Sequence, residues 1–236
     1  MVADTPRDRF STIDRQRFDN LELIGKGRCS MVFSALDREL DRVVALKLAD
    51  ADSHEDVGRY TIQREAIYLA RVSHPNVIAL HQAGWLDRET FALVLPYCPG
   101  TLAEVAAQLD RRSEWRKLLD MLIAAGRGLA ALHELGILHR DIKPDNIMVD
   151  AHGHPQLADL GLACADDDEA ALADMGRRSA VHGAEVLAKR QLDARSDLYA
   201  YCTTAFWLLY GRPPSPARGP SARAGSARRC PKTSFL

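Results

Sequence analysis

One short polar run constrains this 236-residue chain more than any other part of its sequence. The run is His139-Arg140-Asp141-Ile142-Lys143-Pro144-Asp145-Asn146, and Asp159-Leu160-Gly161 follows downstream. Phosphoryl transfer needs such a set of groups. One carboxylate accepts the proton of an attacking hydroxyl, an ammonium balances the phosphoryl charge, and an amide oxygen with a second carboxylate holds metal ions. The spacing of Asp141, Lys143, Asn146 and Asp159 therefore predicts a phosphoryl-transfer site.

The same run resembles the catalytic loop of the eukaryotic-type protein kinases, and a Lys two residues after the Asp is typical of the Ser/Thr kinases. This resemblance implies ATP and Mg²⁺ as cofactors and the Ser or Thr hydroxyl of a protein as acceptor. It implies that Asp141 orients or deprotonates that hydroxyl and that Lys143 contacts the γ-phosphate. Asn146 and Asp159 are expected to hold magnesium.

A second segment, residues 23–33, resembles the glycine-rich loop of the kinases between two strands. Glycine lets backbone N–H groups approach phosphate oxygens without a Cβ in the way. Gly25 and Gly27 match the pattern, whereas Ser30 stands where a third glycine is expected. A G-x-G pattern alone occurs more often in ordinary turns. It gains weight here because an apolar strand ending at Lys47 follows at the spacing of the family.

By resemblance, Lys47 is expected to bind the α- and β-phosphates. An ammonium in a partly buried cleft needs a counter-charge, and Glu65 is the candidate. Glu65 lies in a helical pattern over residues 60–72, which stops before His74-Pro75. A surface glutamate on an amphipathic helix is the alternative. The resemblance also predicts an apolar column that links two lobes, formed by Leu69, Leu80 (on the next strand), His139 and Leu160.

The unbroken apolar run 91–95 predicts a buried strand, which leads into a segment that resembles the kinase hinge. Leu95 is then the gatekeeper. The carbonyl of Pro96 and the N–H and carbonyl of Cys98 are expected to meet the adenine edge, since proline can still accept a hydrogen bond. The ATP-binding assignment also includes apolar side chains that taken singly are more often plain core: Ile24, Val32, Ala45 and Met148.

Leucines at helical spacing predict a long helix over residues 114–135, ended by Gly136. Two short strands, residues 147–149 and 156–158, are expected after the catalytic loop. The turn between them contains two histidines that invite a metal interpretation, although the polarity of a hairpin turn explains them better: His152 and His154.

Further along, Gly183-Ala184-Glu185 stands where the family has A-P-E. Asp197 resembles the buried aspartate that anchors the catalytic loop, and a helix is predicted over residues 197–210. Arg178 occupies the place of the threonine that lines the substrate platform, with Ser179 as the nearest hydroxyl.

Together these patterns predict an α+β, two-lobed protein-kinase-like fold. A small antiparallel β-sheet lobe is joined to a mainly helical lobe that lacks its last helices. Residues 1–18 are interpreted as an N-terminal extension, 19–97 as the small lobe and 98–214 as a partial large lobe. Residues 215–236, rich in Ser, Ala, Pro and Arg, are interpreted as a disordered tail where the resemblance has ended.

Charge and cysteine content limit the classes of binding partner and the cellular compartment that the sequence is compatible with. A formal net charge of −1 argues against nucleic acid or an anionic membrane as partner. The five scattered cysteines include no C-x-x-C pair, which indicates reduced thiols in place of a disulfide frame or zinc site. The start is too charged for a signal peptide, and the apolar stretch 205–210 is far too short to span a membrane. A cytoplasmic protein with no membrane segment is expected.

Three functions remain open from the sequence. A Ser/Thr protein kinase is favoured because every expected ATP and metal ligand is retained. A pseudokinase-like module, which binds ATP or docks a partner without turnover, is favoured by the missing helices and the altered substrate platform. A small-molecule kinase, such as those acting on aminoglycosides, is disfavoured by Lys143-Pro144 and by the Glu185 to Asp197 segment.

Overall fold

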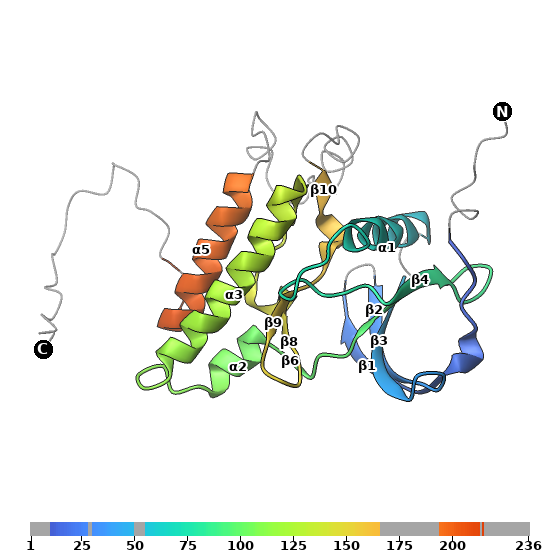
Figure 1. The fold of residues 1–236 in the computed structure, drawn as a ribbon, viewed down its shortest axis with the longest axis horizontal. Coiled ribbons are helices and arrows are strands. Elements are labelled where there is room, and N and C mark those ends of the chain that lie inside the picture. Colours follow the sequence, from blue (N-terminus) through green and yellow to red (C-terminus); the bar gives the residue numbers. More distant parts are fainter. Residues whose placement is uncertain (1–9, 28–29, 50–54, 166–193, 213, 215–236) are drawn as a thin grey trace, which may run out of the picture.

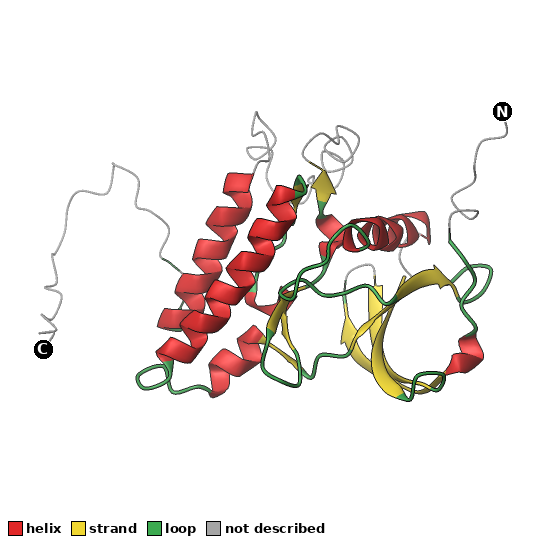
Figure 2. Cartoon of the chain, in the orientation of Figure 1, coloured by secondary structure: helices red, strands yellow, loops and turns green. Residues whose placement is uncertain are grey.

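The computed structural model describes residues 10–27, 30–49, 55–165, 194–212 and 214. The five-stranded sheet and helix α1 (Glu55–Leu69) lie at one end of the molecule and helices α2 (Leu102–Gln108), α3 (Trp115–Glu134) and α5 (Ala194–Tyr210) at the other, with a small sheet between them (Figure 1, Figure 2). The predicted α+β, two-lobed arrangement is confirmed. The sequence predictions at Arg178, Ser179, Gly183-Ala184-Glu185 and residues 215–236 lie outside the described residues.

The small lobe is an antiparallel five-stranded sheet in the order β1-β2-β3-β5-β4. Its central strands are apolar on both faces because α1 packs against one face and a second apolar cluster, which includes Ile13, Phe18, Val44 and Leu46, covers the other. The strands are β1 (Phe18–Lys26), β2 (Ser30–Asp37), β3 (Arg42–Ala49), β4 (Gln82–Trp85) and β5 (Phe91–Pro96).

The helix of the small lobe, α1, runs over Glu55–Leu69 and not over the predicted residues 60–72. Its start was missed because Gly58 is a poor helix former, and packing against the sheet outweighs that propensity. Its end was placed too late, since the chain beyond Leu69 continues only as a tight turn. There the N–H of Val72 donates to the carbonyl of Leu69 at 3.2 Å.

The large lobe is built on three described helices, α2 (Leu102–Gln108), α3 (Trp115–Glu134) and α5 (Ala194–Tyr210). The prediction for α3 is confirmed, and Gly136 follows it with a left-handed φ of 66°. α5 begins three residues earlier than predicted. The short strands of the large lobe are β6 (Gly100–Thr101), β7 (Ile137–Leu138), β8 (Ile147–Val149), β9 (Pro155–Leu157) and β10 (Cys164–Ala165).

The strand β9 starts one residue before the predicted 156–158, because Pro155 pairs with Val149 at the edge of the small sheet. That sheet has the order β6-β8-β9, and β7 pairs separately with β10. Short 3₁₀ helices complete the description: η2 (Arg15–Arg17), η3 (Pro144–Asn146) and η4 (Leu160–Leu162).

The loop after α1 joins the two lobes. The side-chain amide of Asn76 donates to the carbonyl of Pro155 at 2.9 Å, and the N–H of Leu157 donates to the carbonyl of Asn76 at 2.9 Å. Gly128 of α3 faces this loop, where an added Cβ would lie 2.3 Å from the Asn76 carbonyl oxygen. Only glycine allows α3 to approach so closely.

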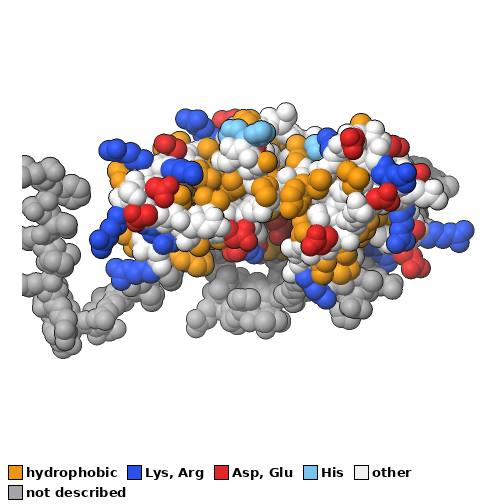
Figure 3. Space-filling model, turned by 90° about the horizontal axis from the view of Figure 1, so that it is seen from below, with side chains coloured by type: hydrophobic (Ala, Val, Ile, Leu, Met, Phe, Trp, Pro, Cys, Tyr) orange, Lys and Arg blue, Asp and Glu red, His pale blue; other side chains and the backbone are white. Residues whose placement is uncertain are grey.

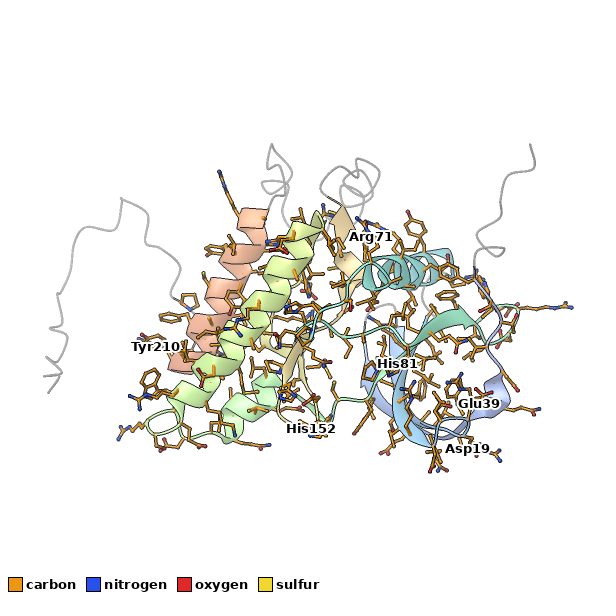
Figure 4. The ribbon with its side chains drawn as sticks, in the orientation of Figure 1. Asp19, Glu39, Arg71, His81, His152 and Tyr210 are labelled. Atoms are coloured by element: carbon orange, nitrogen blue, oxygen red, sulfur yellow. The ribbon has the colours of Figure 1, made fainter. Side chains whose placement is uncertain are left out.

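Basic and hydrophobic side chains are spread unevenly over one face of the molecule. Seen from below, Lys and Arg side chains gather toward the two ends of the molecule and hydrophobic side chains occupy the middle (Figure 3). α5 also exposes aromatic side chains, with Tyr210 66% exposed near the end of the helix (Figure 4). Among the described residues, no helix combines the length and the apolar character that crossing a membrane requires.

A buried ion pair fastens the beginning of β1 to the end of β2. The Arg17 guanidinium donates from Nε to Asp37 Oδ1 at 2.7 Å and from Nη2 to Oδ2 at 2.5 Å. Asp37 is fully buried, and Arg17 also reaches Gln82 of β4 and Glu39, which is labelled in Figure 4. The hydrogen bonds from Arg17 hold the pKa of the Asp37 carboxyl below its ordinary value.

Replacing Arg17 with alanine is expected to lower the free energy of unfolding by about 3 kcal/mol, because the buried carboxylate loses both short hydrogen bonds and keeps only Arg42, whose Nε lies 3.8 Å from Oδ2, as counter-charge. Since the pKa of Asp37 is depressed in the folded state, the pair stabilises the fold above the unfolded pKa of about 3.9. That contribution disappears as the pH falls through the lower folded pKa. Urea unfolding at pH 7 and pH 3 measures both effects.

The matched control is Arg38→Ala, which breaks an exposed Arg38–Asp19 pair of 3.4 Å in the same lobe. Exposed pairs contribute less than about 1 kcal/mol, so this variant should unfold close to the wild type. An equal loss of stability in the two variants would show that burial of Asp37 is not what makes Arg17 matter.

Candidate active site

A cavity of about 510 Å³ lies between the two lobes. The structure brings every sequence-predicted ATP-binding residue into its wall. From the small lobe these are Ile24, Gly25, Gly27, Val32, Ala45, Lys47, Glu65 and Leu95, from the crossing to the large lobe Pro96 and Cys98, and from β8 of the large lobe Met148. The two predicted metal ligands, Asn146 and Asp159, also line it. Sequence reasoning missed several further lining residues: Lys26, Ser30, Ile78, Asp145 and Ala158.

Strand geometry positions Lys47. Side chains alternate along β3, so Ala45 and Lys47 face the cavity together. Val44 and Leu46 point to the other face of the sheet, where they pack with Ile13, Phe18, Ala35 and Val94. Lys47 as a whole residue is only 7% exposed, and its ammonium is enclosed by carboxylates. It donates to Glu65 Oε1 at 2.9 Å and to Oε2 at 2.7 Å, so the predicted counter-charge is in place and the surface alternative for Glu65 is excluded.

Lys47 also reaches the large lobe, where its Nζ lies 2.8 Å from Asp159 Oδ1. Burial works toward a lower pKa of Lys47, but the two carboxylates outweigh it and raise the pKa above the ordinary value. Partial desolvation acts to raise the pKa of Asp159, and the Lys47 ammonium lowers it overall. Burial raises the pKa of Glu65, which shares this single cation with Asp159. At neutral pH the cavity wall therefore carries a fixed ammonium and a charged Asp159 carboxylate.

The backbone at Asp159 is left-handed, with φ of 64°, and the following Leu160 is fully buried in the core shared with Leu69. The turn thus points Leu160 inward and leaves Asp159 in the cavity wall. Leu80 packs on this core but precedes β4, so its predicted position on a strand is wrong. His139 is fully buried, and its Nε2 lies 3.1 Å from the carbonyl of Ala158.

The catalytic-loop residues are tied together beside the cavity. Lys143 Nζ donates to Asp141 Oδ2 at 2.7 Å. The Asn146 amide donates to the same Oδ2 at 2.9 Å and to the carbonyl of Asp141 at 2.7 Å. Asp141 and Lys143 do not line the cavity wall, but Asn146 does and connects them to it. A carboxylate, an ammonium and an amide therefore converge at the mouth of the cavity.

Asp197 of α5 holds the beginning of the catalytic loop through two backbone hydrogen bonds. Its carboxylate is 1% exposed and accepts from the N–H of His139 at 2.7 Å and from the N–H of Arg140 at 2.8 Å. Arg140 has a left-handed φ of 66°, which is unfavourable for a non-glycine residue and needs such support. Burial acts to raise the pKa of Asp197, but the hydrogen bonds hold it below its ordinary value.

Two supporting residues escaped the sequence analysis. His133 Nε2 lies 2.9 Å from Asp197 Oδ2, and Thr204 Oγ1 donates to the carbonyl of Ile142 at 3.3 Å. A signal for both existed, because each polar residue lies four positions from a buried leucine on the same helix face: Leu129 for His133 and Leu208 for Thr204.

The donor atoms fit magnesium. In the described part of the chain, Asn146 Oδ1 and Asp159 Oδ2 accept no hydrogen bond, so an amide and a carboxylate oxygen remain to coordinate an ion. Mg²⁺ is commonly held by one or two such protein oxygens together with water and phosphate. No group of three or more His, Cys, Asp or Glu side chains suited to a metal occurs among the described residues. His154, exposed on its turn, contacts Asp150 at 3.1 Å as a polar turn residue.

Comparison with known proteins agrees with this geometry. A family model described as protein kinase domain matches residues 18–232, so the match extends beyond residue 214, the expected end of the resemblance. The serine/threonine-protein kinase PknK of Mycobacterium tuberculosis is 33% identical over 197 residues, which cover 82% of this chain and 18% of that protein.

Two further relatives are named probable serine/threonine-protein kinases. One from Corynebacterium efficiens is 34% identical over 211 residues, covering 85% of this chain and 32% of the relative. PknB of Corynebacterium glutamicum is 34% identical over 226 residues, covering 91% of this chain and 34% of the relative. The chain therefore spans about a fifth to a third of the length of these relatives. Because the family model covers most of the sequence, and the cavity between the lobes gathers the residues that the family uses, this chain belongs to the protein kinase domain family.

Proposed function

We propose that this chain transfers the γ-phosphoryl group of ATP to Ser or Thr hydroxyls of proteins. The observation that carries the proposal is the Lys47 ammonium, held at 2.7–2.9 Å by Glu65 of α1 and Asp159 of the large lobe. This contact closes the two lobes around the cavity and presents a cation where the α- and β-phosphates of ATP would lie. Active protein kinases require such a Lys–Glu pair.

Adenine would bind at the inner end of the cavity, against the backbone of Pro96 and Cys98 and between the apolar side chains of Val32, Ala45 and Met148. Burial raises the pKa of the Cys98 thiol to about 11, so the thiol stays neutral and places no charge beside the purine. Leu95, the expected gatekeeper, also lines the cavity.

The chemical step belongs to the loop at the mouth of the cavity. Asp141 accepts the proton of the acceptor hydroxyl and holds that oxygen in line with the γ-phosphorus. Lys143, 2.7 Å from Asp141, balances charge on the transferring group. Asn146 and Asp159 would hold Mg²⁺, which would neutralise part of the phosphate charge when bound.

The proposed acceptor is a protein, with no role for nucleic acid, and the proposed compartment is the cytoplasm. The names of the bacterial relatives support a Ser/Thr protein as acceptor. The near-zero net charge and the scattered cysteines, which include no C-x-x-C pair, support the other two assignments.

The test is transfer of labelled phosphate from Mg·ATP, with and without a generic basic protein as substrate. Lys47→Met is the matched control, since it keeps the apolar stem and removes the charge. Wild-type protein should label the substrate, and the variant should do so at least about 100-fold more slowly. Nucleotide binding without any transfer would identify a pseudokinase-like module. Transfer to an aminoglycoside but not to protein would identify a small-molecule kinase.

A further inference from the structure

One face of α1 covers the chain that follows Asp159. A Cβ added to Gly161 would lie 3.2 Å from Thr61 Cγ2 and 3.6 Å from Glu65 Oε2, so this chain lies directly on the helix. The covering face consists of four side chains at positions i, i+3, i+4 and i+7: Thr61, Arg64, Glu65 and Tyr68. Glu65 belongs to the proposed chemistry through Lys47, and Arg64 is the member of this face that donates to the backbone of the covered chain.

Arg64 bridges α1 to the backbone beyond η4. Its Nη2 donates to the carbonyl of Ala163 at 3.0 Å and to Tyr68 Oη at 3.3 Å. The guanidinium carbon lies 5.6 Å from the ring centre of Tyr60 and 5.7 Å from that of Tyr68. Two aromatic rings one turn before and one turn after Arg64 therefore hold the guanidinium in position, and its planar fork loses little freedom when it bonds.

The carbonyl that Arg64 engages has a special place in the chain. Ala163 is fully buried at the end of η4, and its N–H donates to the carbonyl of Leu160 at 2.9 Å. The next residue, Cys164, pairs in β10 with Leu138 of β7. Leu138 immediately precedes the catalytic loop. Arg64 thus connects the helix that carries Glu65 to the strand pair that leads into His139.

The Arg64 bridge stabilises the turn at Asp159. A left-handed backbone at a non-glycine residue is disfavoured, so other conformations of residues 159–162 compete with the one observed. The Asp159 side chain is 46% exposed and is held mainly by Lys47. A hydrogen bond from a charged donor to Ala163, four residues downstream, favours the observed conformation from the other side of the turn.

We propose that Arg64 is a positioning residue that clamps η4 and β10 onto α1 and thereby keeps Glu65 and Asp159 together around Lys47. The proposal rests on the proposed kinase function but assigns Arg64 no contact with ATP, since it does not line the cavity. Loss of the clamp frees the turn at Asp159 and separates the three charged groups that phosphoryl transfer requires.

The test compares Arg64→Met, which keeps the apolar stem, with Arg64→Lys, which can still donate to the Ala163 carbonyl. Two quantities are measured: kcat with the basic protein substrate, and amide hydrogen exchange of residues 160–165 in the nucleotide-free protein. Arg64→Met should lower kcat about tenfold and speed exchange of this peptide about tenfold, the size expected of one hydrogen bond from a charged donor. Arg64→Lys should restore much of both.

The matched control is Arg71→Met. Arg71, labelled in Figure 4, also donates through Nη2 to a backbone carbonyl of the large lobe, that of Leu135 at 3.2 Å, but in an exposed position away from the cavity. It should leave kcat and the exchange of residues 160–165 unchanged. Exchange of β3 and β5 peptides reports global destabilisation, which a local clamp does not cause.

Wild-type kcat and wild-type exchange in Arg64→Met would overturn the proposal, as would equal effects in Arg71→Met or equal acceleration in β3 and β5. If Arg64→Met does not fold, Arg64→Gln is measured in its place under the same criteria. If the wild-type protein transfers no phosphate, the proposed function fails, and the exchange of residues 160–165 still decides whether Arg64 clamps the turn.

Discussion

Asp159→Asn is expected to abolish productive Mg·ATP binding, whereas Asp141→Asn should leave binding nearly intact and remove phosphoryl transfer. Asp159 lines the cavity, contacts Lys47 through Oδ1 and offers Oδ2 to a metal. An amide at this position loses the negative charge that both the ammonium and Mg²⁺ require. Asp141 lies outside the cavity wall, and its contacts are to Lys143 and Asn146.

The expected sizes differ accordingly. Asp159→Asn should weaken Mg·ATP binding about 100-fold or more, because the loss falls on a charged, partly desolvated ligand. Asp141→Asn should lower kcat about 100-fold to 10,000-fold while changing the affinity for ATP only a few-fold. Titration with a fluorescent ATP analogue measures the affinity, and steady-state transfer measures kcat.

Asp120→Asn serves as the control, because it makes the same change of charge at an exposed position of α3. It should resemble the wild type in both assays. Equal losses of nucleotide affinity in Asp141→Asn and Asp159→Asn would contradict the division of roles between them.

Much of this site could be predicted from the sequence because its residues sit at fixed spacings on short, regular elements. Lys47 lies on an apolar strand, and the catalytic loop packs all its groups within eight residues. Local spacing therefore determines which side chains of the catalytic loop meet, whereas the pairing of Lys47 with Glu65 was implied by the resemblance to the kinases. Charge balance also pointed to Glu65, since a buried ammonium demands a carboxylate.

The parts that were missed depend on contacts between distant segments. The beginning of α1 contradicts the low helix propensity of Gly58, and packing on the sheet decides it. His133 and Thr204 become supports of the catalytic loop only because α3 and α5 pack behind it. Arg64 reads as one more charged residue on an amphipathic helix until the position of Ala163 is known. Single-sequence patterns carry no information on such pairings.

Asp197→Ala is expected to combine a large loss of activity with a large loss of stability. The variant leaves the N–H groups of His139 and Arg140 buried without an acceptor, and each costs about 1–3 kcal/mol. The unfavourable backbone of Arg140 also loses its support, so Asp141 is no longer held at the mouth of the cavity. The free energy of unfolding should fall by about 3–5 kcal/mol and kcat by about 100-fold.

Graded variants separate the anchoring of the loop from a general loss of stability. Asp197→Asn keeps one oxygen that can accept a hydrogen bond from one of the two N–H groups. Its stability and kcat should lie between those of Asp197→Ala and the wild type. His133→Ala removes only the contact at Asp197 Oδ2 that does not involve the loop backbone, and Thr204→Val removes one hydrogen bond to Ile142. Both should lower stability modestly and leave kcat within a few-fold of the wild type. If His133→Ala lost as much kcat as Asp197→Ala at similar stability, the two backbone hydrogen bonds would not be the source of the anchoring. The observed geometry argues against this, because both N–H groups reach the Asp197 carboxylate at 2.7–2.8 Å, directly beside the residue that accepts the proton.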